Sequence, residues 1–90
     1  MEIATRIRAK LTEALAPTRL EVEDESHRHA GHAGHDPRGE SHFRVTVVSD
    51  RFAGRGRVER HRMVNAVLAE ELKDRVHALA LRTLTPGEDA

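Results

Sequence analysis

Ninety residues suffice for one compact domain, because a second hydrophobic core would leave each half too little apolar surface to offset the entropy of ordering the chain. The 15 Lys and Arg balance the 15 Asp and Glu, so a formal net charge of zero excludes a global attraction to nucleic acid or membranes. The absence of Cys excludes disulfides and thiolate ligands, and suits a reducing compartment. No apolar stretch approaches the roughly 18 residues of a membrane span, and the N-terminal MEIATRIRAKLTEAL is more typical of a folded helix than of a secretory signal. We therefore expect a single domain over residues 1–90, in the cytoplasm and without a membrane partner.

The first predicted element is an amphipathic helix over residues 2–16. Ile3, Ile7 and Leu11 recur at helical spacing, with charged residues between them. Pro17 ends the helix, since proline lacks an amide hydrogen and disfavours helical geometry in the residue before it.

A hairpin with a long loop is predicted over residues 19–49. In its first strand Leu20 and Val22 alternate with acidic residues, as in a half-buried strand. Its loop, residues 26–40 (SHRHAGHAGHDPRGE), holds four Gly or Pro, four His and no bulky apolar residue. The second strand has β-branched residues and an apolar face formed by Phe43, Val45 and Val47.

The C-terminal half predicts a helix over 57–72, a strand over 76–84 and a polar tail over 85–90. The helix carries an apolar face, formed by Val64, Val67, Leu68 and Leu72. The order helix, strand, strand, helix, strand favours an α+β fold with helices on one face of the sheet. We expect the third strand to lie beside one of the hairpin strands.

Four segments between Leu20 and Pro86 closely resemble the BolA family: LEVEDESHRHAGH, GESHFRVTVVSDRFAG, VERHRMVNAVLAEEL and VHALALRTLTP. The resemblance implies a fold like that of the class II KH domain, with a three-stranded mixed sheet. It also implies a partnership with a monothiol glutaredoxin in iron–sulfur cluster handling, and, for bacterial members, transcriptional regulation. Abundant Ala and Arg hint at a GC-rich bacterial genome.

The resemblance also implies two ligand histidines. His77 matches the family's C-terminal ligand, although its context alone is more typical of a structural histidine at a strand edge. His29 follows DESHR, where relatives place His or Cys. Imidazoles can replace thiolates on one iron of a two-iron cluster. Since this chain has no Cys, we expect a [2Fe–2S] cluster shared with the partner and glutathione, and no cofactor on the chain alone.

Other histidines are weaker candidates for metal binding. Besides His29, the loop carries three histidines: His27, His32 and His35. Their spacing would allow two or three of the loop histidines to reach one metal ion. The alternative is that the loop binds metal only adventitiously. His42 opens a strand opposite Phe43 and is expected to be exposed. His61 lies near the apolar face of the second helix and is expected to be packed.

Positive charge concentrates around the start of the second helix, at Arg55, Arg57, Arg60 and Arg62. These arginines suit the backbone of double-stranded DNA or an acidic partner. An ordinary solvated surface, partly paired with Glu59, is an equal alternative. The segment GRG does not match the GXXG loop with which KH domains clamp nucleic acid.

Nothing in the sequence predicts an enzyme. There is no Cys, the serines lie in no recognised catalytic arrangement, and the acidic residues are typical of solvated faces. We therefore expect a binding and adaptor protein that pairs with a glutaredoxin, with DNA-binding regulation as the alternative. Alone, it is expected to be a monomer or weak homodimer.

Overall fold

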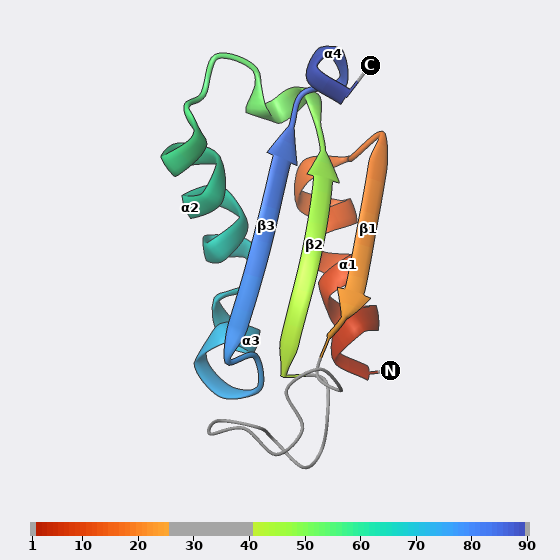
Figure 1. The fold of residues 1–90 in the computed structure, drawn as a ribbon, viewed down its shortest axis with the longest axis vertical. Helices are drawn as coiled ribbons and strands as arrows, with labels where there is room; N and C mark the ends of the chain where they lie inside the picture. The colour runs from red at the N-terminus through yellow and green to blue at the C-terminus, as the bar shows by residue number, and fades with distance from the viewer. Residues whose placement is uncertain (1, 26–40, 90) are drawn as a thin grey trace.

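The computed structural model describes residues 2–25 and 41–89. Its elements, in chain order, are α1 (Glu2–Leu15), β1 (Arg19–Asp24), β2 (His42–Val48), the short 3-10 helix η2 (Asp50–Phe52), α2 (Arg57–Val67), α3 (Ala69–Asp74), β3 (Ala78–Leu84) and α4 (Pro86–Asp89). Figure 1 shows the three strands as one layer in front of α1, with α2 along the β3 side. The predicted α+β class is confirmed.

The three strands form one mixed sheet in the order β1-β2-β3. β1 is antiparallel to β2, with Leu20 opposite Val47, whereas β3 runs parallel to β2, with Phe43 opposite Leu79. A parallel neighbour requires a crossover connection, and α2 with α3 provides it. The third strand thus lies beside a hairpin strand, as predicted.

The core lies between α1 and one face of the sheet. The apolar stripe of α1 is buried at Ile3, Ile7 and Leu11, and it packs in one cluster with Phe43 and Val45 of β2. The opposite face carries exposed charged side chains, among them Glu21, Arg44 and Arg82. The sheet is therefore covered on one side, as the helix-on-sheet expectation required.

Two elements differ from their predicted bounds. The helix expected over 57–72 is divided at Leu68, whose backbone (φ −99°, ψ 18°) separates α2 from α3. The strand expected over 76–84 begins at Ala78. Val76 is 4% exposed and anchors the start of that segment in the core. His77 therefore lies just before the first residue of β3.

The division at Leu68 directs α3 toward α1 and inserts a carboxylate between the two helices. Glu71 is 1% exposed, and its Oε2 lies 2.8 Å from Arg6 Nη2 and 2.8 Å from Lys10 Nζ. Burial disfavours a charged carboxylate unless it is paired, and these two cations from α1 pair it. The ion pairs thus hold α3 against α1.

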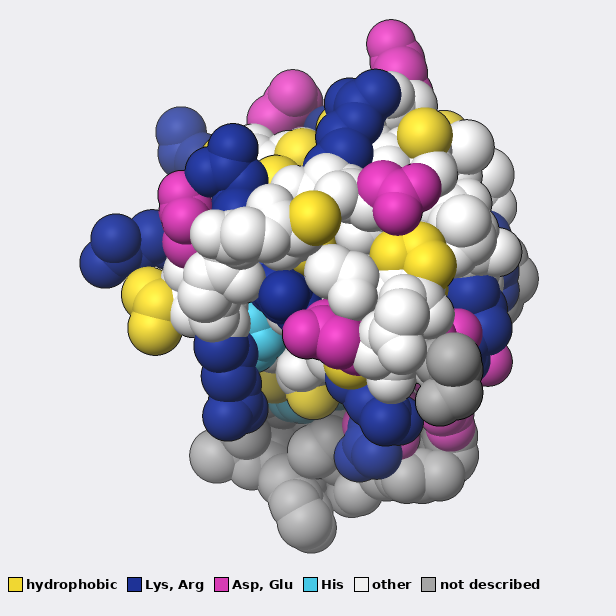
Figure 2. Space-filling model, turned by 90° about the horizontal axis from the view of Figure 1, so that it is seen from above, with side chains coloured by type: hydrophobic (Ala, Val, Ile, Leu, Met, Phe, Trp, Pro, Cys, Tyr) yellow, Lys and Arg dark blue, Asp and Glu magenta, His cyan; other side chains and the backbone are white. Residues whose placement is uncertain are grey.

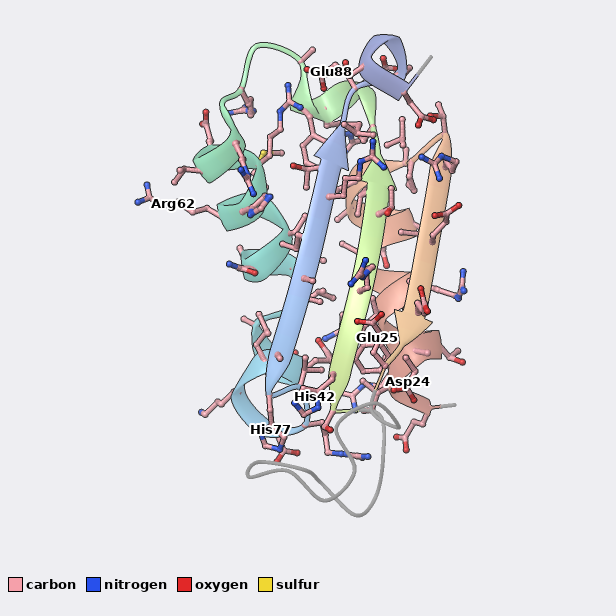
Figure 3. All side chains as sticks on the ribbon, viewed as in Figure 1. Asp24, Glu25, His42, Arg62, His77 and Glu88 are labelled. Carbon is pink, nitrogen blue, oxygen red and sulfur yellow. The ribbon has the colours of Figure 1, made fainter. Side chains whose placement is uncertain are left out.

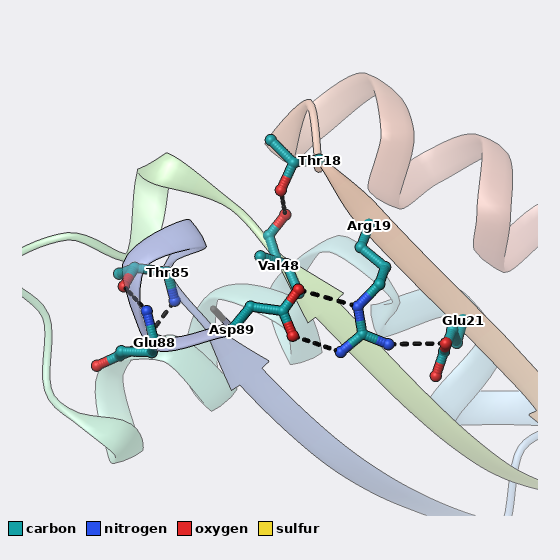
Figure 4. Close-up of polar contacts among 7 residues, drawn as sticks. All are labelled: Thr18, Arg19, Glu21, Val48, Thr85, Glu88 and Asp89. Atoms are coloured by element: carbon teal, nitrogen blue, oxygen red, sulfur yellow. Dashed lines mark hydrogen bonds and ion pairs between the residues drawn. The ribbon is translucent and has the colours of Figure 1, made fainter.

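The tail expected over 85–90 contains the short helix α4, which is tied to the sheet (Figure 4). Glu88 Oε1 accepts a hydrogen bond of 2.8 Å from the Thr85 N–H, and Thr85 Oγ1 accepts one of 3.3 Å from the Glu88 N–H. This is a capping box, with Pro86 at the first helical position. Asp89 accepts two hydrogen bonds from Arg19 of β1, of 3.1 and 2.6 Å. The motif TPGE carried this signal, which an interpretation as a plain polar tail missed.

Within residues 2–25 and 41–89, no helix is both long enough and apolar enough to cross a membrane.

Candidate functional site

His77 lies at the edge where β2 and β3 begin. Because these strands are parallel, their first residues meet at the same end of the sheet. The backbone N–H groups of His77 and Ala78 both donate to the Ser41 carbonyl oxygen, over 2.7 and 3.2 Å. The His77 side chain is exposed, whereas the preceding Val76 is buried. The backbone is therefore held firmly while the imidazole faces outward.

His42 lies beside His77 at this edge (Figure 3). The two ring centroids are 6.4 Å apart, with the ring planes inclined at 55°. His42 is half-buried, and its Nδ1 lies 2.9 Å from the Ser41 hydroxyl oxygen. The expectation that His42 is simply exposed is wrong, because the parallel register packs its ring against its neighbours. No local pattern marks this pair, which depends on the pairing of β2 with β3.

A buried carboxylate completes the described part of this edge. The Glu25 backbone N–H donates to the His42 carbonyl oxygen over 2.7 Å, and the Glu25 side chain is 11% exposed with Oε2 3.4 Å from Arg44 Nε. No group of three or more His, Cys, Asp or Glu in the described part of the chain is placed to hold a metal ion. Two imidazoles alone are an incomplete ligand set for a metal centre.

The loop histidines proposed as ligands lie outside the described residues: His27, His29, His32 and His35. The described chain stops at Glu25 and resumes at Ser41, and both residues contact the edge that carries His42.

Two of the four arginines singled out from the sequence are engaged in ion pairs within the domain. Arg55 Nη1 lies 2.6 Å from Glu59 Oε2, one helical turn later, which is the pairing considered from the sequence. Arg60 is held more tightly: Nη1 lies 2.6 Å from Glu88 Oε1 and 3.1 Å from the Thr83 carbonyl oxygen, and the side chain is 12% exposed.

Arg60 anchors α4 through its contact with Glu88. Its guanidinium also lies 5.9 Å from the centroid of the Phe52 ring, a cation–π arrangement. The hydrogen bond from Arg60, followed by the Thr85 backbone N–H, lowers the pKa of the Glu88 carboxyl to about 2. Arg60 is thus engaged within the domain, and its assignment to a nucleic-acid or partner surface stays a prediction.

The other two arginines, Arg57 and Arg62, are exposed on α2, and neither forms an ion pair with another described residue. Seen from above, basic side chains lie in several groups with acidic ones between them (Figure 2). Of the four arginines, Arg57 and Arg62 are therefore the two without an ion pair to another described residue, and the basic surface itself stays a prediction.

The architecture and these residues match a known family. A family model described as BolA-like protein matches residues 11–88. The chain is 54% identical over 88 residues to the DNA-binding transcriptional regulator BolA of Escherichia coli strain K12, a match covering 98% of this chain and 80% of that protein. It is also 48% identical over 89 residues to SufE-like protein 1, chloroplastic/mitochondrial, of Arabidopsis thaliana, covering 92% of this chain and 24% of that protein. The solved BolA domain of SufE1 from Arabidopsis thaliana superposes with a TM-score of 0.89 at 46% identity, covering 98% of this chain and 96% of that one. The chain belongs to the BolA family.

Proposed function

We propose that this chain is an adaptor that pairs with a monothiol glutaredoxin and shares a [2Fe–2S] cluster with it. The observation that carries the proposal is the pair of imidazoles, His42 and His77, 6.4 Å apart at one accessible edge of the sheet. A second support is the firm backbone position of His77, bonded to Ser41. A ligand held on a strand edge needs little ordering when it binds.

The donor set of this edge fits a cluster shared at an interface. Imidazole can replace thiolate on one iron of a two-iron cluster, and such a cluster has a raised reduction potential. The chain offers imidazoles but no Cys, so the thiolates would come from the partner and from glutathione. A glutaredoxin supplies the ligand type that this chain lacks.

The second ligand has two candidates, His42 and His29. His42 is favoured by its place beside His77, and the Ser41 hydroxyl 2.9 Å from Nδ1 orients its ring. His29 is favoured by the resemblance to the BolA family, which implies a ligand at this position. Comparison of the His42→Ala and His29→Ala variants in the spectroscopic experiment decides between them.

The experiment adds the apo protein to a cluster-loaded monothiol glutaredoxin in the presence of glutathione and records visible absorption and circular dichroism. The wild-type chain is expected to change both spectra, and the His77→Ala variant is expected to lose that change. A His77→Cys variant is expected to restore a spectral change, because thiolate is also a ligand. An unchanged wild-type spectrum, or a normal change with His77→Ala, contradicts the proposal.

DNA-binding regulation is a second candidate, supported by the name of the Escherichia coli relative and by Arg57 and Arg62 on α2, which form no ion pair with another described residue. It predicts duplex binding that weakens as salt rises, with a smaller salt slope after substitution of Arg57 and Arg62 by Ala. Fluorescence anisotropy with a labelled duplex measures the slope. Binding that ignores both salt and the two arginines eliminates this candidate.

Both candidates describe an adaptor or regulator without catalytic activity, acting in the cytoplasm. Fractionation of the host cell tests the compartment. The proposal further takes the chain alone to be a monomer or weak homodimer, which sedimentation tests directly.

A further inference from the structure

A basic groove runs between α2 and the outer edge of β3. It is lined by Arg57 and His61 of α2 and by Leu81, Arg82, Thr83 and Leu84 of β3. The lining contains two arginines, one histidine and no carboxylate. The groove lies toward the end of β3 opposite His77, so it is separate from the histidine edge.

The outer edge of β3 carries unused backbone hydrogen-bonding groups. Among the described strands, β3 pairs only with β2. The backbone of Ala78 and Leu84 faces that strand, as their hydrogen bonds to Ser41 and Ser49 show. By the alternation of a strand, the backbone groups of the odd-numbered residues face outward; these are Leu79, Leu81 and Thr83.

Only one of these outward groups has a partner within the described chain. The Thr83 carbonyl oxygen accepts from Arg60 Nη1 over 3.1 Å. The outward groups of Leu79 and Leu81, and the Thr83 N–H, have no partner among the described residues. Such an edge is a template for one more strand.

The charge of the groove selects an acidic occupant. Neither Arg57 nor Arg82 forms an ion pair with another described residue. Asp89 is within electrostatic range of Arg82, but its carboxylate is hydrogen-bonded to Arg19. Arg82 lies on the open face of the sheet and Arg57 on the helix side, so acidic side chains on either face of an added strand would meet an arginine.

We propose that this groove binds an extended acidic segment of a partner protein, which adds to β3 as a fourth strand. Backbone pairing would supply affinity, and the two arginines would select for acidic sequence. Leu81 and Leu84 also line the groove and offer apolar surface to the aliphatic parts of the segment. A single-stranded nucleic acid suits the groove less well, because its lining has no aromatic side chain for base stacking.

The test uses the full chain labelled with ¹⁵N and a synthetic peptide of alternating Glu and Val. Addition of the peptide is expected to shift the amide signals of Leu79, Leu81 and Thr83 and to slow their hydrogen exchange. A peptide of alternating Lys and Val serves as the charge control and is expected not to bind. Arg57→Glu and Arg82→Glu are each expected to weaken binding about fivefold, the scale of a partly solvated charge pair.

Arg62→Glu is the matched control variant. It makes the same charge change on the same helix, but the Arg62 side chain points away from the sheet (Figure 3). Its affinity for the peptide is expected to stay within about twofold of wild type, as for a charge well separated from the bound strand. Far-UV circular dichroism establishes that the variants are folded, and Arg82→Gln provides a milder change at the same position.

Strand addition has a further signature in the peptide itself. N-methylation of alternate peptide residues is expected to abolish binding for one set of positions and spare it for the other, because only one set faces β3. Equal binding of both methylated peptides, or unchanged exchange at Leu79, Leu81 and Thr83, overturns the proposal. Tighter binding of a thymidine oligonucleotide of equal charge also overturns the proposal. Protection of these amides that rises with protein concentration alone overturns it as well, because that result would assign the edge to a second copy of the chain.

Discussion

Replacement of Glu71 by Gln is expected to destabilise the domain by about 2 kcal/mol near neutral pH. The side chain of Glu71 is fully buried and pairs with Arg6 and Lys10 of α1, each over 2.8 Å. Glutamine keeps the shape and one acceptor oxygen but removes the negative charge between two cations. The substitution therefore tests the charge and leaves the packing nearly unchanged.

The magnitude follows from the exposure of the partners. Loss of one member of a fully buried ion pair costs about 3–5 kcal/mol, because the remaining charge stays buried. Here the side chains of Arg6 and Lys10 are 40% and 32% exposed, so both cations can regain water. A cost nearer 2 kcal/mol follows, which for 90 residues corresponds to a fall in Tm of about 10 °C.

The cost depends on pH with a defined sign. Burial raises the pKa of Glu71, but hydrogen bonds from Lys10 and the backbone and the charges of Lys10 and Arg6 together lower it below the ordinary 4.5. A carboxyl with a lowered folded pKa stabilises the fold above its unfolded pKa and loses that contribution as pH falls through the folded value. The difference between wild type and Glu71→Gln should therefore shrink in acid.

Urea unfolding followed by far-UV circular dichroism measures this difference, since the chain has no Trp or Tyr for fluorescence. Glu70→Gln is the matched control, because Glu70 is 82% exposed and lies 3.7 Å from the same Lys10. Its cost should stay below about 0.5 kcal/mol. Equal costs for the two variants, or a Glu71 effect that persists undiminished in acid, would refute the reasoning.

Three further predictions concern the core, the α4 anchor and the end of α1. Leu11→Ala, at a fully buried position, should cost about 3 kcal/mol in urea unfolding, whereas Val58→Ala, at a position 64% exposed, should cost less than about 0.5; similar costs would contradict the assignment of the core. The Glu88 carboxyl should titrate by NMR with a pKa of about 2, and in Arg60→Gln this pKa should move toward its ordinary value of 4.5. The contact with Arg60 therefore stabilises the fold above pH 4.5, and this contribution is lost as the pH falls toward 2. An unshifted pKa in the variant counts against the contact. Ser49→Ala should cost about 1–3 kcal/mol in the same urea assay, because its buried hydroxyl donates over 2.6 Å to the Leu15 carbonyl oxygen at the end of α1 and accepts a hydrogen bond of 3.1 Å from the Arg51 N–H of η2. A cost within error of zero would show that neither bond matters.

The elements governed by local patterns were predictable from the residues. The spacing of Ile3, Ile7 and Leu11 predicted α1 and its buried face, and Pro17 correctly placed its end to within a residue or two. The alternation in β2 likewise placed Phe43 and Val45 in the core. Periodicity determines such features because it reflects which side of one element faces apolar surroundings.

The residues that meet at the candidate site were harder to predict from the sequence. The resemblance to BolA proteins singled out His77, and that assignment stays a prediction for the spectroscopic test. The neighbouring position of His42 depends on β3 pairing in parallel with β2, a contact between distant segments that no local pattern encodes. The capping box at Thr85 was visible in the sequence and explains α4, but its anchoring by Arg19 was not.

By itself, the sequence determined the family, the order of the elements and the buried faces of α1 and β2, because these depend on neighbours along the chain. Only the tertiary structure decided which polar groups meet. Arg60 looked like its neighbour Arg57 in the sequence, yet it is held by Glu88, 28 residues away, while Arg57 borders an open strand edge. A charge is available to a partner only when the fold brings no opposite charge to it, and that depends on contacts between segments far apart in the chain.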